Sequence, residues 1–322
     1  MSDLREFEDL TEIETSDLTK YSELEKYIFD PFYEHRYVEA ASNGLTDIAR
    51  DSGKVGTKAI STTENLVSGY SFFEENKEKM RQDYLERLTG SIISEEKVQR
   101  FIKIIKDFWY DGRPERTTSD EIWEIKKSIR NYLIERTGST KHTVKDENRD
   151  IKPLFETYQM GHLLHVTHEM FDHYIQDYLQ LRQDCMENSS NRIYIHRGIR
   201  VDELLSEGEY YEYDYINSYS LAQSVPEQFT AIARNGKFRA MIGGCANDFS
   251  DQILAFAPFI PEMDIKQLEL CIIPGIYPLR VRYDGEYSGV HEYTLSDPRG
   301  MGSFKDLIDA MAKGEIGPSA PR

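Results

Sequence analysis

The stretch YYEYDYINSYSLAQSVPEQF, residues 210–229, changes its periodicity halfway along. Its first half carries Tyr at almost every second position, which predicts a strand because successive side chains of a strand point to opposite faces. We expect the odd-numbered tyrosines to face the core, and Ser218 and Ser220 to face the other way. The second half has helical spacing, with Val225 and Phe229 as its expected buried anchors. Two small hydroxyls side by side form a polar floor that can orient a charged group or a sugar.

Further elements are predicted on both sides of this stretch. Helical spacing favours a helix over 94–109 that begins at Ser94, a second that begins at the capping box Thr118–Glu121 and ends at Gly138, and a long one over 154–182. Short segments rich in β-branched and aromatic residues predict strands. These are RIYIHRG (192–198), LELCIIPG (268–275), YPLRVRYDG (277–285) and VHEYTLSDP (290–298). The predicted fold class is therefore α+β.

The order of these elements suggests two parts. Residues 1–137 are predicted to form a mostly helical domain of unknown role. Residues 138–153 begin as a polar, aperiodic stretch typical of a linker, and residues 154–322 hold the strands.

Composition narrows the classes of function. The 322 residues carry a net charge of −18, which repels phosphate backbones and anionic lipids, so we expect no membrane partner and no non-specific nucleic-acid binding. The 3 cysteines show no metal-binding spacing, which favours reduced thiols in a cytoplasmic setting. The first residues, MSDLREFEDL, lack the apolar segment of a signal peptide, and the longest apolar run, ILAFAPFI, is too short to span a bilayer.

Two charged residues occupy informative places on the predicted strands. Arg197 lies near the end of RIYIHRG, and the next residue, Gly198, permits close approach of another backbone. The planar guanidinium of an arginine suits a diphosphate. Glu292 lies within VHEYTLSDP on the same face as Val290, where a carboxylate needs a role or a partner. The alternatives are a surface ion pair for Arg197 and an edge-strand, solvent-facing position for Glu292.

The ordered set of Arg197, Ser218-Tyr219-Ser220 and Glu292 resembles the Arg–Ser–Glu signature of ADP-ribosyltransferases of the cholera-toxin and ecto-enzyme type. Members of this family carry an Arg on the first strand, a Ser-Thr-Ser followed by a helix with a buried Phe, and a Glu on a late strand. The resemblance covers roughly residues 154–310. It implies an ADP-ribosyltransferase-like split β-sandwich with flanking helices.

The resemblance also implies a function. The chain would be an NAD-dependent ADP-ribosyltransferase or an NAD glycohydrolase, with NAD as its substrate and a macromolecule, most simply a protein, as the acceptor. Glu292, Ser218 and Arg197 would be catalytic, and Arg197, Gly198, Ser218 and Ser220 would bind NAD, without a metal. In toxin-like and phage systems a preceding helical domain binds a protein partner or delivers the enzyme into another cell, and residues 1–137 are expected to do the same.

One position departs from the family pattern. Many members have Glu or Gln two residues before the catalytic Glu, where it helps to select an arginine or asparagine acceptor. Val290 occupies that position relative to Glu292. The acceptor is therefore left open between a protein side chain, another group and water.

Two other readings of the sequence stay open. The same fold could serve without catalysis as a virion or assembly component. Alternatively, a metal-dependent hydrolase could use the helix face from His162 to His173, where His165, Glu169 and His173 are four residues apart. A solvated polar face accounts for the same pattern, because one helix seldom supplies a whole coordination sphere.

Overall fold

The computed structural model describes residue 29 and residues 69–110, 119–137, 150–181, 193–211, 216–222, 224–232, 236–275, 279–287 and 289–296. Several sequence predictions fall outside these residues. They concern Thr118 and Gly138 at the helix ends, most of the expected linker, the tyrosines at 213 and 215, and the C-terminal tail.

The predicted helices are present, with changes at their ends. The first described helix is α4 (Gly69–Leu88). The helix α5 (Glu95–Ile104) begins after Ser94 as expected, but it passes into a π-helical segment, η3 (Ile105–Tyr110), instead of continuing as an α-helix. The helix α6 (Asp120–Thr137) starts one residue later than predicted, because Ser119 Oγ accepts the N–H of Glu121 at 3.2 Å and so acts as the cap. The long helix is α7 (Thr157–Leu181).

The strands form an eight-stranded mixed sheet in the order β2-β7-β8-β4-β1-β3-β6-β5. The tyrosine-rich stretch supplies two strands instead of one, β2 (Tyr210–Tyr211) and β3 (Asn217–Ser220), and α8 (Ser224–Ile232) follows. Four of the predicted strands are confirmed. The strands β4 and β5 were not predicted, because adjacent glycines interrupt β4 and because β5 is a short apolar run. The bounds of these six are β1 (Tyr194–Val201), β4 (Phe238–Cys245), β5 (Ile253–Phe256), β6 (Glu269–Ile272), β7 (Leu279–Tyr287) and β8 (Val290–Ser296). Two short 3₁₀ helices, η5 (Ala246–Gln252) and η6 (Ala257–Phe259), flank β5.

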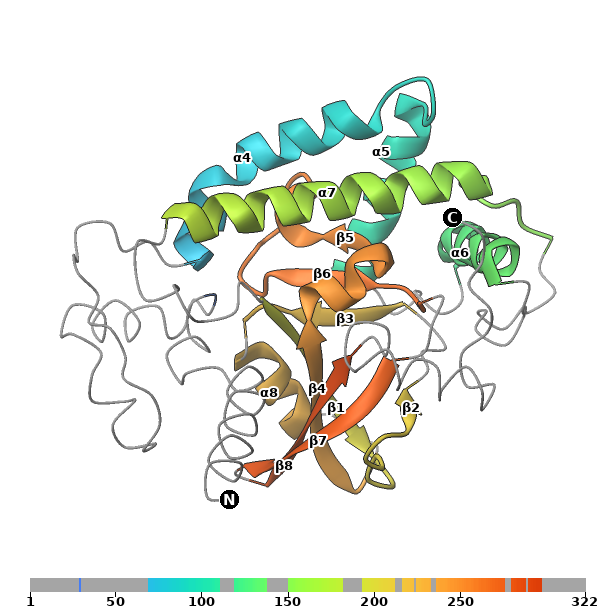
Figure 1. Ribbon diagram of the computed structural model, residues 1–322. Coiled ribbons are helices and arrows are strands. Elements are labelled where there is room, and N and C mark those ends of the chain that lie inside the picture. Colours follow the sequence, from blue (N-terminus) through green and yellow to red (C-terminus); the bar gives the residue numbers. More distant parts are fainter. Residues whose placement is uncertain are drawn as a thin grey trace, which may run out of the picture.

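The sheet is almost divided between β1 and β3. The strand β1 pairs with β4 along its whole length, whereas its described pairing with β3 is the single register position His196–Ser220. Figure 1 shows that β3, β5 and β6 lie crosswise to β1, β4, β7 and β8. The fold is therefore α+β, with one sheet bent into two parts that meet where β1 and β3 separate.

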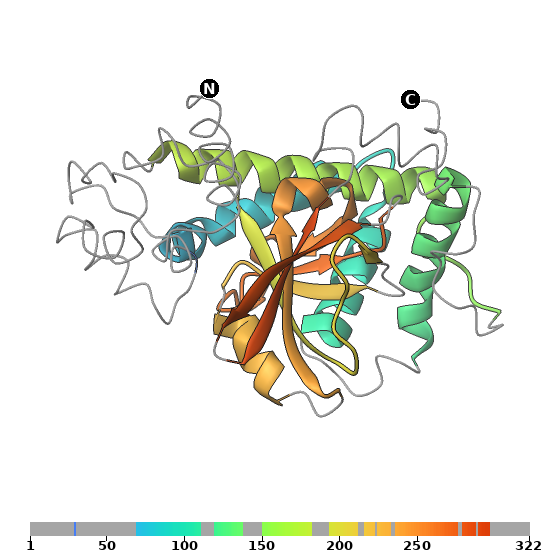
Figure 2. The ribbon, with the colours of Figure 1, turned by 60° about the horizontal axis from the view of Figure 1, so that its bottom comes forward.

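The helices α4 and α7 lie side by side and cover the β5–β6 end of the sheet (Figures 1 and 2). Aromatic rings join the two layers: the Phe73 and Phe256 ring centroids are 5.3 Å apart, as are those of Tyr84 and Phe259. One hydrophobic core accordingly contains residues from the helices and from the strands. The partition of the chain at residues 138–153 stays a prediction, and the described parts on its two sides are packed together.

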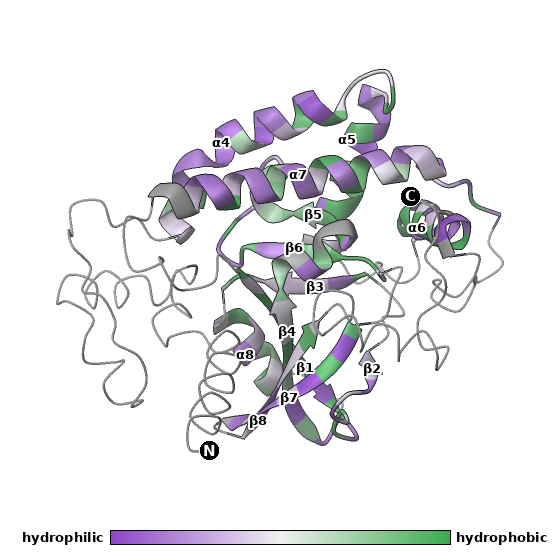
Figure 3. Ribbon diagram, in the orientation of Figure 1, coloured by the Kyte–Doolittle hydropathy of each residue, from purple (hydrophilic) through white to green (hydrophobic). Residues whose placement is uncertain are grey.

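The predicted apolar face of α7 is confirmed, and hydrophilic residues occupy much of the outer surface of α4 and α7 (Figure 3). Within the described residues, no helix is both long and apolar enough to cross a membrane. The buried side chains of the α7 face are Met160, Leu163, Leu164, Phe171, Tyr174 and Tyr178.

The expectation that Phe229 is buried is wrong. Phe229 is 46% exposed, because α8 packs on the sheet through a different face, which contains Val225, Pro226 and Thr230. Val225 is buried as expected.

Candidate functional site

The two serines of the Ser-Tyr-Ser segment differ in their surroundings. Ser218 is half-buried, whereas Ser220 is 4% exposed. The Ser220 hydroxyl accepts the Ala222 N–H at 2.9 Å and lies within donating distance of two carbonyl oxygens, those of Gln267 and Ala222. Ser220 therefore joins the end of β3 to the start of β6, and its hydrogen-bonding capacity is used within the protein. Tyr219 between them is buried, as predicted.

Arg197 lies where β1 and β3 separate. By the sheet register its neighbours on β4 and β8 are Ile242 and Tyr293. Its guanidinium nonetheless reaches across to β3, where Nη1 donates to the main-chain oxygen of Ser218 at 3.3 Å. Arg197 and Ser218, which the sequence analysis placed in one site, are thus neighbours in the structure.

Gly198 permits the close approach of another backbone, as the sequence indicated, and that backbone belongs to α8. A Cβ atom at this position would lie 1.9 Å from the main-chain oxygen of Pro226 in α8. Only glycine lets α8 approach β1 this closely. On the side of the sheet toward which a Gly198 side chain would point, α8 therefore covers Gly198.

Glu292 lies apart from the serines. It occupies β8 opposite Met241 of β4, and Met241 in turn lies opposite Gly198 of β1. Three strand spacings along the sheet separate β8 from β3, which is roughly 14 Å at the usual distance between strands. The structure therefore brings together Arg197, Ser218 and Ser220 but leaves Glu292 two strands from Arg197 and three from the serines.

A different carboxylate is next to the serines. Glu269 begins β6 directly opposite Ser220, and Cys271 is opposite Ser218, so Glu269 and both serines share one face of the β3–β6 pair. The side chain of Glu269 is half-buried. Sequence reasoning missed this residue, although a signal was present: Gln267 stands two residues before Glu269, as in the pattern that Val290 fails to meet.

His196 also faces this group. Its register partner on β3 is Ser220, so it shares the face of the two serines and Glu269. A Cβ atom at Gly243 would lie 2.7 Å from Nδ1 of His196, which shows that the imidazole lies over the glycine of the neighbouring strand. The face thus presents His196, Ser220 and Glu269 on three adjacent strands.

Two histidines of α7, His165 and His173, pair with carboxylates of their own helix. His165 Nε2 lies 3.4 Å from Glu169, and His173 Nε2 lies 3.5 Å from Asp177, all with side chains at least two-fifths exposed. Among the residues that the structure describes, no group of three or more His, Cys, Asp and Glu side chains is arranged to hold a metal ion.

Comparison with known proteins gives only distant similarities. No family model matches the chain, and no curated protein matches it. Among solved structures, the ADP-ribosyltransferase Vis in complex with agmatine is 14% identical over 71% of this chain and 86% of that chain, with a TM-score of 0.30. The Vis toxin, an ADP-ribosyltransferase from Vibrio splendidus, is 14% identical over 65% of this chain and 88% of that chain, with a TM-score of 0.25. Similarity at these TM-scores does not define a shared fold.

Proposed function

We propose that the chain is an NAD-dependent ADP-ribosyltransferase or NAD glycohydrolase that uses Glu269. One observation carries this proposal: a cation and a carboxylate lie on either side of a Ser-x-Ser strand. Arg197 donates to the main chain of Ser218 from β1, and Glu269 lies opposite Ser220 on β6. This is the set of groups that the Arg–Ser–Glu signature implies, with Glu269 in the role that the sequence analysis gave to Glu292.

The chemistry needs few groups. The bond between nicotinamide and C1′ of the ribose breaks, and its electron pair stays on the nicotinamide nitrogen, which leaves neutral and needs no general acid. The ribose becomes oxocarbenium-like, as in glycoside cleavage. Glu269 accepts a hydrogen bond from a ribose hydroxyl and places negative charge beside the developing cation. Arg197 holds a phosphate of NAD, and Ser218 orients the bound ribose.

The acceptor is the second part of the proposal. Gln267 is exposed and stands two residues before Glu269. In the family that the sequence resembles, Glu or Gln at this position helps to select an arginine or asparagine acceptor. We therefore assign a protein side chain as the acceptor. Labelled NAD incubated with the chain and a cell lysate should transfer its label to protein, whereas a glycohydrolase would release only free ADP-ribose.

The decisive experiment compares two isosteric variants. Glu269→Gln should lower the rate of nicotinamide release by at least about a hundredfold, which is the usual effect of removing one electrostatic group at a reacting centre. Glu292→Gln should stay within about threefold of the unchanged protein. Nicotinamide release is measured by chromatography, and NAD binding by calorimetry shows that both variants retain the substrate site.

Two results would contradict the proposal. If Glu292→Gln lost nicotinamide release while Glu269→Gln kept it, the carboxylate would be misassigned. If the unchanged protein released no nicotinamide with or without lysate, the proposed enzymatic function would be wrong. A non-catalytic role as a virion or assembly component would then be favoured.

A further inference from the structure

The chain that leads from η6 into β6 contains two residues in an unusual backbone conformation. Glu262 has φ of 60° and Leu268 has φ of 41°, although neither is glycine. In this left-handed region a Cβ atom crowds the neighbouring carbonyl group, so the conformation persists only where surrounding contacts enforce it. Leu268 directly precedes Glu269. The contacts that hold residues 260–268 therefore decide how Glu269 enters the sheet.

The C-terminal end of residues 260–268 is held by the end of β3. The Ser220 hydroxyl donates to the Gln267 carbonyl oxygen, and the Leu221 N–H donates to the Leu268 oxygen at 3.3 Å. The Leu268 N–H bonds to the Ile265 oxygen at 2.8 Å, and the Leu268 side chain is fully buried. These bonds fix the backbone on both sides of the left-handed residue.

The N-terminal end is held by a residue far away in sequence. Arg81 of α4 donates from Nη2 to the Met263 oxygen at 2.6 Å, across a separation of 182 residues. Its Nη1 pairs with Glu78 at 2.5 Å, and its side chain is only 9% exposed. A guanidinium at this depth must be bound by polar partners, because an unpaired buried charge is strongly unfavourable. The Met263 carbonyl is one of these partners, so the helix and the loop depend on each other.

A second cation supports the same turn from the surface. Lys106 of η3 lies 2.6 Å from the Glu262 carboxylate, and this hydrogen bond lowers the pKa of Glu262. The Glu262 side chain is 82% exposed, so its contribution is small. The buried contact of Arg81 is the stronger restraint on the loop.

We propose that Arg81 is a positioning residue: by binding the Met263 carbonyl it holds residues 260–268 in their strained path and so aims the Glu269 carboxylate at the serine face. This inference rests on the proposed function only in giving Glu269 a reaction to serve. It assigns to helix α4 a direct effect on the site, although α4 contributes none of the groups proposed to contact NAD.

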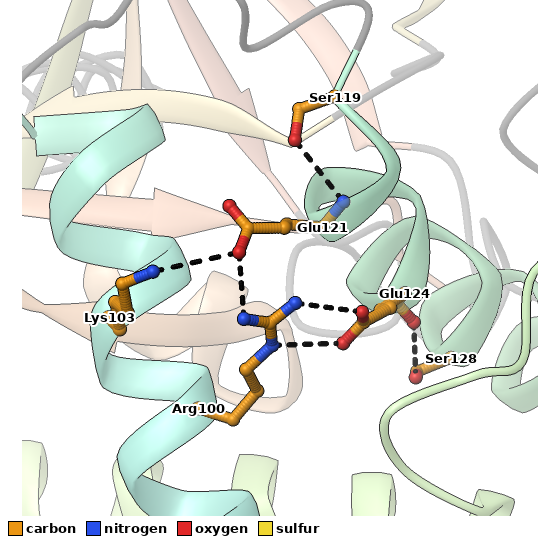
Figure 4. A network of polar contacts seen from close by, with 6 residues as sticks. All are labelled: Arg100, Lys103, Ser119, Glu121, Glu124 and Ser128. Atoms are coloured by element: carbon orange, nitrogen blue, oxygen red, sulfur yellow. Dashed lines mark hydrogen bonds and ion pairs between the residues drawn. The ribbon is translucent and has the colours of Figure 1, made fainter.

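The test replaces the guanidinium and keeps the length of the side chain. Arg81→Met removes both hydrogen bonds, Arg81→Lys retains a donor for Met263, and Arg100→Met is the matched control. Arg100 binds Glu121 and Glu124 between α5 and α6 through its guanidinium, with Lys103 also near Glu121 (Figure 4), and neither of these bonds involves residues 260–268. The control therefore loses two ion pairs elsewhere in the helical layer, at a partly buried arginine.

We expect Arg81→Met to lower kcat for nicotinamide release by about tenfold or more, because small displacements of a reacting group have effects of this size. KM for NAD should change by less than about twofold, and Arg81→Lys should recover part of kcat. Arg100→Met should keep kcat even if its melting temperature falls as far. Amide hydrogen exchange of residues 260–268 should become faster in Arg81→Met and not in Arg100→Met.

Hydrogen exchange separates this inference from the proposed function. If the unchanged protein releases no nicotinamide, the proposed function fails, and faster exchange of residues 260–268 in Arg81→Met alone still supports the positioning contact. Unchanged exchange in Arg81→Met would overturn the inference. So would an equal loss of kcat in Arg81→Met and Arg100→Met, because the effect would then reflect general destabilisation.

Discussion

At the scale of single residues, the two serines of one strand have different roles. The Ser220 hydroxyl is hydrogen-bonded to the main chain of Ala222 and Gln267. Ser218 is half-buried, and Arg197 binds its main-chain oxygen. The resemblance to ADP-ribosyltransferases implied that both bind NAD. Under the proposed function Ser218 is the residue that meets the substrate, whereas the bonds of Ser220 hold the end of β3 to the chain that enters β6.

This difference predicts a stability effect. Ser220→Ala leaves the Ala222 N–H and the Gln267 carbonyl without the hydroxyl, so the free energy of unfolding should fall by about 1–3 kcal/mol. Urea denaturation measures the change. Ser206→Ala, at an exposed position, is the control and should stay within about 0.5 kcal/mol. An equally small effect at Ser220 would show that its buried hydrogen bonds are replaced by water.

At the scale of elements, α4 and α7 are joined by a buried polar contact within their apolar interface. The Tyr84 hydroxyl lies 2.9 Å from Thr167 Oγ1, and Thr167 donates its own hydrogen to the Leu163 oxygen at 2.8 Å. Tyr84 must therefore be the donor. Burial raises the pKa of the Tyr84 hydroxyl far above its ordinary value, so the donor stays protonated.

Removal of this contact should destabilise the helix pair. Tyr84→Phe should lower the free energy of unfolding by about 1–2 kcal/mol, because Thr167 then lacks its donor. Thr167→Val removes the partner, and the double variant should cost less than the sum of the single variants. A double-mutant cycle measured by thermal unfolding gives this coupling. Strictly additive effects would show that the two hydroxyls do not interact.

At the scale of the whole molecule, the helices and the sheet depend on one core. Phe73 of α4 packs edge-on against Phe256 of β5, and Phe171 of α7 contacts the same ring at 5.1 Å. This arrangement explains why Arg81 can act on Glu269 across the layers. It also means that α4 is a structural part of the strand-containing half.

A truncation tests this dependence. A fragment of residues 150–322 should lack a cooperative unfolding transition and show weak near-ultraviolet circular dichroism. Loss of each large buried aromatic side chain costs about 3–5 kcal/mol, against a typical total stability of about 5–15 kcal/mol. A fragment of residues 69–322 keeps α4 and should unfold cooperatively. A well-dispersed spectrum from residues 150–322 alone would show instead that the helices are dispensable.

The amino-acid sequence by itself determined what depends on near neighbours in the chain. The apolar face of α7, the start of α5 at Ser94 and the alternation around Tyr219 follow from helical and strand periodicity, which a short window of residues contains. The assignment of Arg197 and the two serines to two separate strands also follows from local periodicity, although β1 continues past Arg197 to Val201 instead of ending there.

Only the tertiary structure decided which carboxylate meets the serines. Glu269 and Glu292 each lie on a short strand, so strand periodicity cannot separate them. Gln267, two residues before Glu269, is a local difference, but it does not indicate which strand pairs with β3. Their difference is the order of strands in the sheet, which places β6 beside β3 and β8 on the far side of β4. The β5–β6 end of the sheet packs against α4 and α7. Because this packing joins residues far apart in the chain, no local pattern contains it.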